Sequence, residues 1–417
     1  MEGAKLRSAG PSRRFRSIPV KSRRLAAAQG GVRDLYERVL SDPRDARAWR
    51  VLALNFAGAG QVSRAVACLD ALEATGRGDA PPEEAPALRR AAGREAVARQ
   101  TGLRASLGGG DACRVSVVVT GRPGEAASQR TLESLAAQSI RRNDRQSIVH
   151  EDPSEGLARA RGRYVALVEA GDELWPDHLE MLADQLDRTG GAMTYSRALR
   201  PGPLRPWATA GHPVVPRQAA NEEFVPASCV LVRRRELLVS GGLDPALGHG
   251  QAWHLWRRLV ERRPVDPVPV LSAQVGSDDV SPERRFDLLL VKRGGLARAR
   301  RWHRKARRHL DRGDVRLAAA DLGHAWNLGL DVEPYLAAVA AVAQHSQRTA
   351  ASLVALGAGE AEPHLRGAFQ RIARGAEARR ELAIRMHRHA LRMRYDQADQ
   401  RGLERARSLG WLEGPVG

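Results

Sequence analysis

Residues 162–181, GRYVALVEAGDELWPDHLEM, decide the fold that we expect for this chain. The apolar run Tyr164–Val168 is typical of a buried strand. Three acids follow it, namely Glu169, Asp172 and Glu173. Pro176 suits the first turn of a helix, and Leu179, Leu182 and Leu186 then share one helical face. Carboxylates at the carboxyl end of a strand predict a ligand site, and a solvated acidic turn is the alternative.

The charge of the chain favours anionic partners. Among 417 residues, 67 are Lys or Arg and 48 are Asp or Glu, which gives a net charge of +19. Nucleotide phosphates, nucleic acid, acidic glycans and an anionic membrane surface all fit such an excess. Nucleic-acid binding is the weakest of these, because no recognisable reading motif is present.

Cysteine usage and hydropathy address the compartment. Only three cysteines occur, and they are far apart, which indicates a reducing environment. No apolar run approaches the ~20 residues of a membrane span, and no secretory signal follows the basic start. We therefore expect a cytoplasmic protein, with peripheral contact to the inner membrane face as an alternative.

The first hundred residues divide into two parts. Residues 1–31 are basic and contain prolines and serines, which predicts a disordered tail that either solvates the chain, touches a polyanion or acts as a transit peptide. Residues 32–100 have helical spacing. The small and large residues of a tetratricopeptide-like repeat match Trp49, Leu52, Ala53, Phe56, Ala65, Leu69 and Leu72, so this part resembles such a hairpin. An unrelated pair of helices is the alternative.

A second strand is predicted at Val115–Val119, before a helix with Leu132, Leu135 and Ala136 on its buried face. The segment VSVVVTGRPGEAASQRTLESLAAQS, with its Thr-Leu-x-Ser-Leu run and Gln138, resembles the opening of family 2 glycosyltransferases, which have the GT-A fold. GRYVALVEAGDELWPDHLE resembles the family's metal-binding segment. Residues 226–259 resemble its acceptor side. The resemblance covers roughly residues 113–275.

The resemblance implies a specific chemistry. In this family a nucleotide-sugar donor loses its nucleoside diphosphate while an acceptor hydroxyl attacks the sugar. A divalent cation, Mn²⁺ or Mg²⁺, neutralises the diphosphate, and a carboxylate takes the proton from the acceptor. The acceptor would be a polysaccharide, another glycan, a lipid or a protein.

The sequence departs from the family at the positions that matter most. The family's two metal-binding carboxylates align with Glu169 and Gly171, so Asp172 is the remaining candidate for the second metal ligand. The family's Glu-Asp pair, whose Asp is the catalytic base, aligns with Gln251 and Ala252. His254 is the weak remaining candidate for a proton acceptor.

The remaining candidates follow from the same resemblance. The nucleotide side would use Thr120, Glu151, Asp152 and Arg161, and the acceptor side would use Trp175, Asp244 and Trp253. Trp253 has helical spacing with Trp256, so a core position is the first interpretation and sugar stacking the second. Residues 146–150 are either the family's second strand or part of a segment from which that strand has been deleted.

The chain after Asp278 is helical by pattern and strongly basic. Ten Lys or Arg stand against one acid between Lys292 and Arg312. A solvated face is the default interpretation, and a patch for an anionic membrane or other polyanion is the alternative. Residues 299–332 are a second candidate repeat, and further helices are expected over 333–344, 350–356, 364–375 and 379–409. The histidines of this region lack the spacing of a metal site.

We therefore predict an α/β protein in four parts. Residues 1–31 form the tail, 32–100 a tetratricopeptide-like hairpin, 111–278 a GT-A-like, Rossmann-related domain with a mixed sheet, and 285–417 a basic helical region that is partly tetratricopeptide-like. One functional hypothesis is a glycosyltransferase. The other is a non-catalytic descendant that binds a protein partner through its helices.

Overall fold

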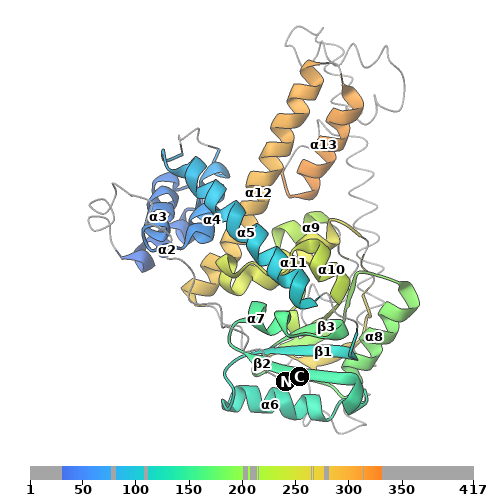
Figure 1. Cartoon of the computed structure of the whole chain (residues 1–417). Helices are drawn as coiled ribbons and strands as arrows, with labels where there is room; N and C mark the ends of the chain where they lie inside the picture. Colours follow the sequence, from blue (N-terminus) through green and yellow to red (C-terminus); the bar gives the residue numbers. More distant parts are fainter. Residues whose placement is uncertain are drawn as a thin grey trace, which may run out of the picture.

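The computed structural model describes residues 31–76, 81–107, 111–200, 205–206, 214, 216–263, 265, 267–276, 281–312 and 314–330. It is a mixed α/β structure in which a sheet domain adjoins a group of helices, and a long helical hairpin extends from both (Figure 1). The predicted tail over 1–30 and the helices expected after residue 332 lie outside the described residues.

The main sheet has five strands in the order β2-β1-β3-β8-β5. Their bounds are β1 (Cys113–Thr120), β2 (Arg145–His150), β3 (Gly162–Glu169), β5 (Met193–Tyr195) and β8 (Val230–Arg233). Strand β1 is parallel to β2 and β3, whereas β8 is antiparallel to β3 and β5. The two predicted strands, β1 and β3, are parallel neighbours. Residues 146–150, for which the sequence left a strand undecided, lie in β2.

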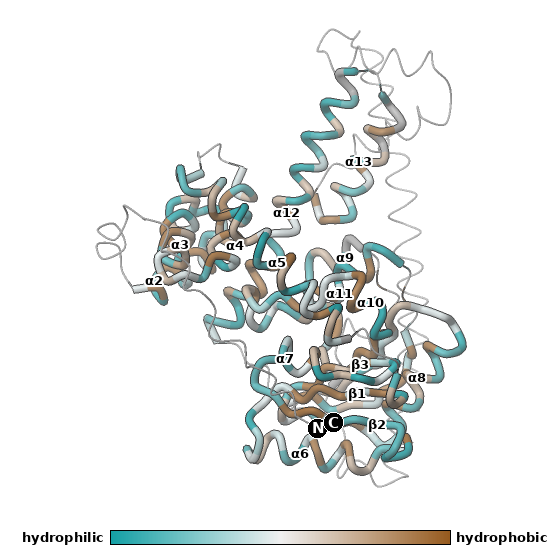
Figure 2. Tube along the Cα trace, viewed as in Figure 1, coloured by the Kyte–Doolittle hydropathy of each residue, from teal (hydrophilic) through white to brown (hydrophobic). Residues whose placement is uncertain are grey.

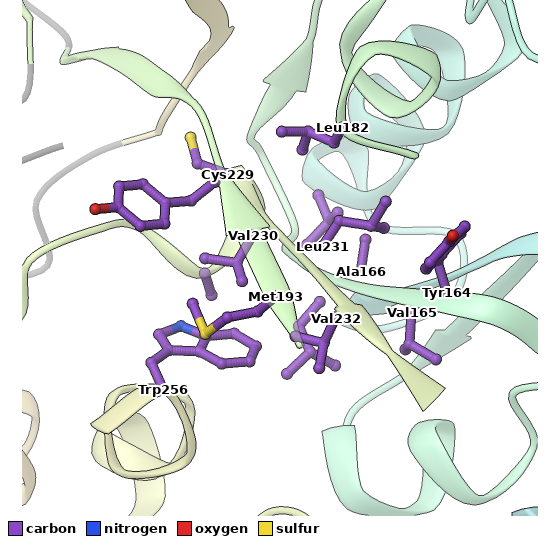
Figure 3. Packing of buried hydrophobic residues seen from close by; sticks show 14 of the residues in the cluster. Tyr164, Val165, Ala166, Leu182, Met193, Cys229, Val230, Leu231, Val232 and Trp256 are labelled. Carbon is purple, nitrogen blue, oxygen red and sulfur yellow. The ribbon is translucent and has the colours of Figure 1, made fainter. Parts of the chain in front are cut away.

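The core of this sheet is apolar on both faces, as expected for parallel strands covered on both sides. Val115, Val117 and Val119 are fully buried in β1, and the central residues of β3 are nearly so. Figure 3 shows Tyr164, Val165 and Ala166 beside the antiparallel Val230–Val232, with Trp256 closing the same core.

Helices on opposite faces connect the parallel strands. The chain passes from β1 to β2 through α6 (Ala126–Ala136) and from β2 to β3 through α7 (Pro153–Ala158), and these two helices lie on either side of the sheet (Figure 1). Helix α8 (His178–Thr189) buries the three predicted leucines completely. It begins after Pro176, with Asp177 at the cap position. Ala136 is exposed, so its predicted burial is wrong; Ser128, Thr131 and Leu135 are the residues that α6 buries.

A second sheet of four short strands has the order β4-β9-β6-β7 and was not predicted. Its strands are β4 (Glu173–Leu174), β6 (Arg197–Arg200), β7 (Arg205–Pro206) and β9 (Leu271–Gln274). Further elements of the domain are η1 (Arg142–Asp144), α9 (Pro216–Asn221), η2 (Ala227–Cys229), α10 (Arg234–Ser240), η3 (Pro245–Gly250) and α11 (Gln251–Val260). The pairing of β4 with β9 brings the chain after Leu271 beside the loop that follows β3.

The N-terminal helices share a core with a helix far along the chain. They are α2 (Val32–Ser41), α3 (Ala46–Gly58), α4 (Val62–Glu73) and α5 (Ala85–Leu107), and their partner is α12 (Pro282–Asp311). Phe286 of α12 is fully buried and stacks on Tyr36 and Trp49, with ring centroids 4.0 and 5.8 Å apart. These parts of the chain therefore pack as one layer.

Helix α12 continues beyond this core and pairs with α13 (Val315–Asn327). Its outer half is mainly hydrophilic, whereas β1 and β3 are hydrophobic (Figure 2). The positive charges do not all face solvent, because Arg293 is 8% exposed. Arg301 and Arg304 are exposed and pair with Glu73. The tetratricopeptide-like character of both hairpins stays a prediction. Among the described helices, none combines the length and the hydropathy that crossing a membrane requires.

Candidate functional site

Three parallel strands end at one edge of the main sheet. Thr120 pairs with His150 of β2 and with Glu169 of β3, so the residues after these strands lie side by side. We call the segments 120–122, 150–152 and 169–172 the carboxyl edge. This edge brings together the predicted residues Thr120, Glu151, Asp152, Glu169 and Asp172.

The loop after β3 is held by α6. The buried Thr131 hydroxyl donates to the Asp172 carbonyl oxygen at 2.8 Å and accepts from the Gly171 amide at 2.9 Å. Gly171 has a φ of +100°, a conformation that side-chain-bearing residues rarely adopt. The absence of a side chain at this position therefore serves the turn.

Gln138 anchors the continuation of the same loop. Its amide donates to the carbonyl oxygens of Leu174 and Trp175 at 3.2 and 2.7 Å, and its oxygen accepts from the Leu179 amide. Ser134 accepts from the Leu174 amide. The Thr-Leu-x-Ser-Leu run and Gln138 thus have a structural task, which is to fasten the segment that carries the acids.

Asp172 is buried, with 5% of its surface exposed. Its Oδ1 accepts from the Gly276 amide at 2.6 Å, and its Oδ2 accepts from the Ser228 hydroxyl. Ser228 also accepts from the Glu169 amide at 3.1 Å. Burial, and next the charge of Glu169, raise the pKa of Asp172 to about 6. The carboxylate therefore ties three parts of the chain together.

Glu169 is accessible, since 49% of its side chain is exposed. Arg284, near the start of α12, lies 3.5 Å from its carboxylate and 3.6 Å from that of Glu223. The carboxyl edge thus presents an exposed acid beside a largely buried guanidinium.

The other side of the edge is polar and open. Glu151 forms an ion pair with Arg122 at 3.0 Å, and both side chains are more than 60% exposed. Asp152 caps α7 by accepting from the Ser154 amide at 2.7 Å. Arg122 and Glu151 are free to rearrange around a ligand, whereas Asp152 has a helix-capping role.

Arg161 does not join this site. It precedes β3, whereas Glu169 ends that eight-residue strand, so the two lie at opposite edges of the sheet. Its backbone amide donates to Ser116 and Gln146. We correct the sequence prediction accordingly, because a strand of this length separates Arg161 from Thr120 by roughly 25 Å.

The predicted acceptor-side residues have structural contacts instead. Trp253 is 3% exposed, and its indole donates to the Ala219 carbonyl oxygen at 2.7 Å, which confirms the core interpretation. Trp175 is also buried. Asp244 caps η3 by accepting from the Ala246 amide and pairs with Arg99 at 3.3 Å.

His254 is a poor proton acceptor in this setting. Burial lowers the pKa of His254 well below the usual range. Several cationic neighbours lower it further, and Arg258 has the largest effect among them. Its Nδ1 is buried without a hydrogen bond among the described residues. Gln251 and Ala252, at the family's acidic pair, supply no carboxylate.

A divalent cation does not fit the predicted pair. Both oxygens of Asp172 already accept protein hydrogen bonds, and Glu169 faces Arg284. Over the part of the chain that the structure describes, no cluster of three or more His, Cys, Asp or Glu could hold a metal ion. Hard cations prefer several oxygen ligands, whereas within the predicted pair only the Glu169 carboxylate is accessible, and it lies beside the Arg284 guanidinium.

Sequence reasoning missed Ser228, Gly276, Glu223 and Arg284. Ser228 lies in the Pro-Ala-Ser-Cys segment that enters β8, which was assigned to the acceptor side without a role for the hydroxyl. Arg284 was grouped with the basic C-terminal helices. Neither carries a local signal for the site, because their contacts with the acids span 56 and 115 positions of the chain.

Comparisons with known proteins give limited similarity. No family model and no curated protein matches the chain. Among solved structures, residues 1–349 of S. aureus TarS in complex with UDP match at 12% identity and a TM-score of 0.36, over 58% of this chain and 90% of that one. Mannosyltransferase PcManGT from Pyrobaculum calidifontis, in complex with GDP-Man and Mn²⁺, matches at 14% identity and a TM-score of 0.31, over 75% and 97%. Similarity this low assigns no ligand, so the contacts and charges of this chain's own residues have to indicate one.

Proposed function

We propose that this chain is a glycosyltransferase-like protein that binds a nucleotide-activated sugar at its carboxyl edge. The observation that carries the proposal is the arrangement of β2, β1 and β3. The connections after β1 and β2 leave on opposite faces of the sheet, and open α/β sheets bind ligands in the crevice at such a switch point. The sequence resemblance supplies the class of ligand.

Charge supports a diphosphate at this edge. Arg122 and Arg284 flank the edge from two sides, and guanidinium groups recognise phosphate oxygens through paired hydrogen bonds. Each already faces a carboxylate, so a bound diphosphate would compete with Glu151 and Glu169 for these groups. Because the acids do not fit a cation site, we derive no step through a metal ion.

The proton transfer that glycosyl transfer requires has no acceptor among the candidate residues. Gln251 and Ala252 lack the acid, and His254 is buried among arginines. Loss of general-base assistance typically slows a reaction by 10²–10⁴-fold. This observation favours a second candidate function, in which the chain binds a donor or a protein partner without turnover. The glycan, lipid or protein acceptor, the partner of the helices, the polyanion contact and the cytoplasmic location stay predictions.

Calorimetry with UDP-GlcNAc and GDP-mannose, each with and without Mn²⁺, tests donor binding. We expect heat from at least one donor, and Arg284→Ala should weaken that binding by roughly tenfold or more, because it removes a charge-assisted contact. Glu173→Ala is the control, because Glu173 is exposed at the start of β4, just after the carboxyl edge. This variant should bind the donor as the original protein does. Absence of heat with every donor would refute the proposal and leave the binding-module hypothesis.

Donor turnover separates the two candidates. The protein is incubated with the donor that binds, and released nucleoside diphosphate is measured by mass spectrometry. Release that Glu169→Ala abolishes supports catalysis at the carboxyl edge. Binding without release supports the non-catalytic candidate.

A further inference from the structure

A cavity of about 310 Å³ lies away from the carboxyl edge, where α10 and α11 meet α12 and α13. It is lined by Val239, Arg258, Glu261, Arg262, Arg298 and Trp302, among others. In Figure 1 the extended hairpin of α12 and α13 meets α10 and α11 beside the sheet domain. We call this space the α11–α12 cavity.

Two arginines at the end of α11 donate to carbonyl groups. Arg257 donates to the Val291 carbonyl oxygen at 2.8 Å, and Arg258 donates to those of Ser240 and Gly242. Carbonyl oxygens carry no full charge, and the Nε of Arg257 is buried without a hydrogen bond among the described residues. Both guanidinium groups therefore contribute positive charge to the surroundings of the cavity.

Among the described residues that line the cavity, Glu261 is the one acid. Arg298 pairs with it at 3.1 Å, and Arg257 approaches it at 3.8 Å. Arg262 also lines the cavity, is exposed, and has no side-chain partner among the residues that the structure describes. Four arginines thus gather around one carboxylate.

The pKa values of two of these arginines follow mainly from their burial. Burial lowers the pKa of Arg257 and of Arg258 to about 10; Glu261 opposes the shift at Arg257 and Asp244 opposes it at Arg258, whereas a neighbouring arginine adds to the shift in each case. A buried charge is costly unless it is paired, and Glu261 cannot pair with four cations. An anion in the cavity would supply the missing charge.

The wall opposite α11 is aromatic. The Trp302 ring stacks on His324, with centroids 4.7 Å apart, and the Lys305 ammonium lies 4.7 Å from the centroid of the same ring. The cavity therefore combines an aromatic wall with the exposed guanidinium of Arg262.

We propose that the α11–α12 cavity binds a small multivalent oxyanion, through Arg262 and Arg298. Phosphate and carboxylate groups each present a pair of oxygens that a guanidinium group can bind through two parallel hydrogen bonds. The cavity is large enough for a compound that carries two or more such groups. This site is independent of donor binding at the carboxyl edge, because it shares none of its residues.

Calorimetry of the full chain at 150 mM NaCl provides the test, with pyrophosphate and citrate as separate probes. We expect at least one of them to bind, and the preferred probe distinguishes a phosphate ligand from a carboxylate ligand. Arg262→Ala should weaken binding about tenfold or more. Glu261→Gln should strengthen it severalfold, because it removes the one repelling carboxylate.

Arg263→Ala is the matched control. Arg263 is exposed, is adjacent in sequence and does not line the cavity, so this variant removes the same charge from the chain. It should bind as the original protein does. Equal losses in Arg262→Ala and Arg263→Ala would show general attraction to a basic protein and would overturn the proposal. Failure of both probes to bind the original protein would also overturn it.

Discussion

At the scale of single residues, one buried carboxylate organises the candidate site. Asp172 accepts hydrogen bonds from Ser228, which precedes β8, and from Gly276, which follows β9. Thr131 fixes its backbone from the other side. Asp172, which the sequence resemblance suggests as a metal ligand, therefore joins the two sheets. Of the two predicted metal ligands, only Glu169 remains accessible.

The titration of Asp172 should be visible in the stability of the protein. Its pKa is raised from 3.8 to about 6 on folding, so the native state binds a proton more readily than the unfolded state does. The free energy of unfolding should consequently fall as the pH rises from about 4 to about 6, by up to about 3 kcal/mol from this group. Asp172→Asn should remove this part of the pH dependence, which urea denaturation at a series of pH values would measure.

The neighbouring Glu173→Gln provides the control for that experiment. Its side chain is exposed on the same loop, and the variant should retain the pH profile of the original protein. If Asp172→Asn has the same profile as well, Asp172 does not titrate in this range and water reaches its carboxylate.

At the scale of elements, periodicity decides what could be predicted. Strands β1 and β3 are continuous apolar runs, and the buried leucines of α8 recur at helical spacing, so each element carries its own signal. Strands β4, β6, β7 and β9 contain two to four residues each and have no period to detect. Gly276, which follows β9, was missed for the same reason.

Local sequence patterns also could not predict that α12 packs against the N-terminal helices. Ten Lys or Arg dominate the stretch from Lys292 to Arg312, whereas the packing of α12 depends on Phe286 near its beginning. Nothing local indicates that Phe286 stacks on Tyr36, 250 positions earlier.

Phe286→Ala should strongly destabilise the helical layer. The ring is fully buried between Tyr36 and Trp49, and truncation of a buried phenylalanine typically costs about 3–5 kcal/mol. Leu317→Ala is the control, because that side chain on α13 is 54% exposed and its loss should change stability by less than about 0.5 kcal/mol. Thermal unfolding followed by circular dichroism compares the two. Similar midpoints would contradict the packing role of Phe286.

At the scale of the whole molecule, two cores meet at α11 and η3. Trp256 of α11 packs in the core of the main sheet, whereas Trp253 of the same helix and Leu247 of η3 pack with the N-terminal helices and α12. The predicted boundary between a hairpin over 32–100 and a domain over 111–278 follows the chain, whereas the apolar contacts cross it. The N-terminal helices therefore act as a cover for the sheet domain and α12.

Deletion of residues 1–76 should accordingly damage more than the deleted helices. It removes Tyr36, Trp49 and Phe56 from around Phe286, and it leaves Arg64's partner Asp287, which is mostly buried, without its cation at 2.5 Å. We expect the melting temperature of the remainder to fall by about 10 °C or more and its binding of a hydrophobic dye to rise. Deletion of residues 1–31 alone keeps all of these contacts and should leave both measurements unchanged. If the two deletions melt alike, the sheet domain and α12 are stable without their cover, and the second core contributes little to the fold.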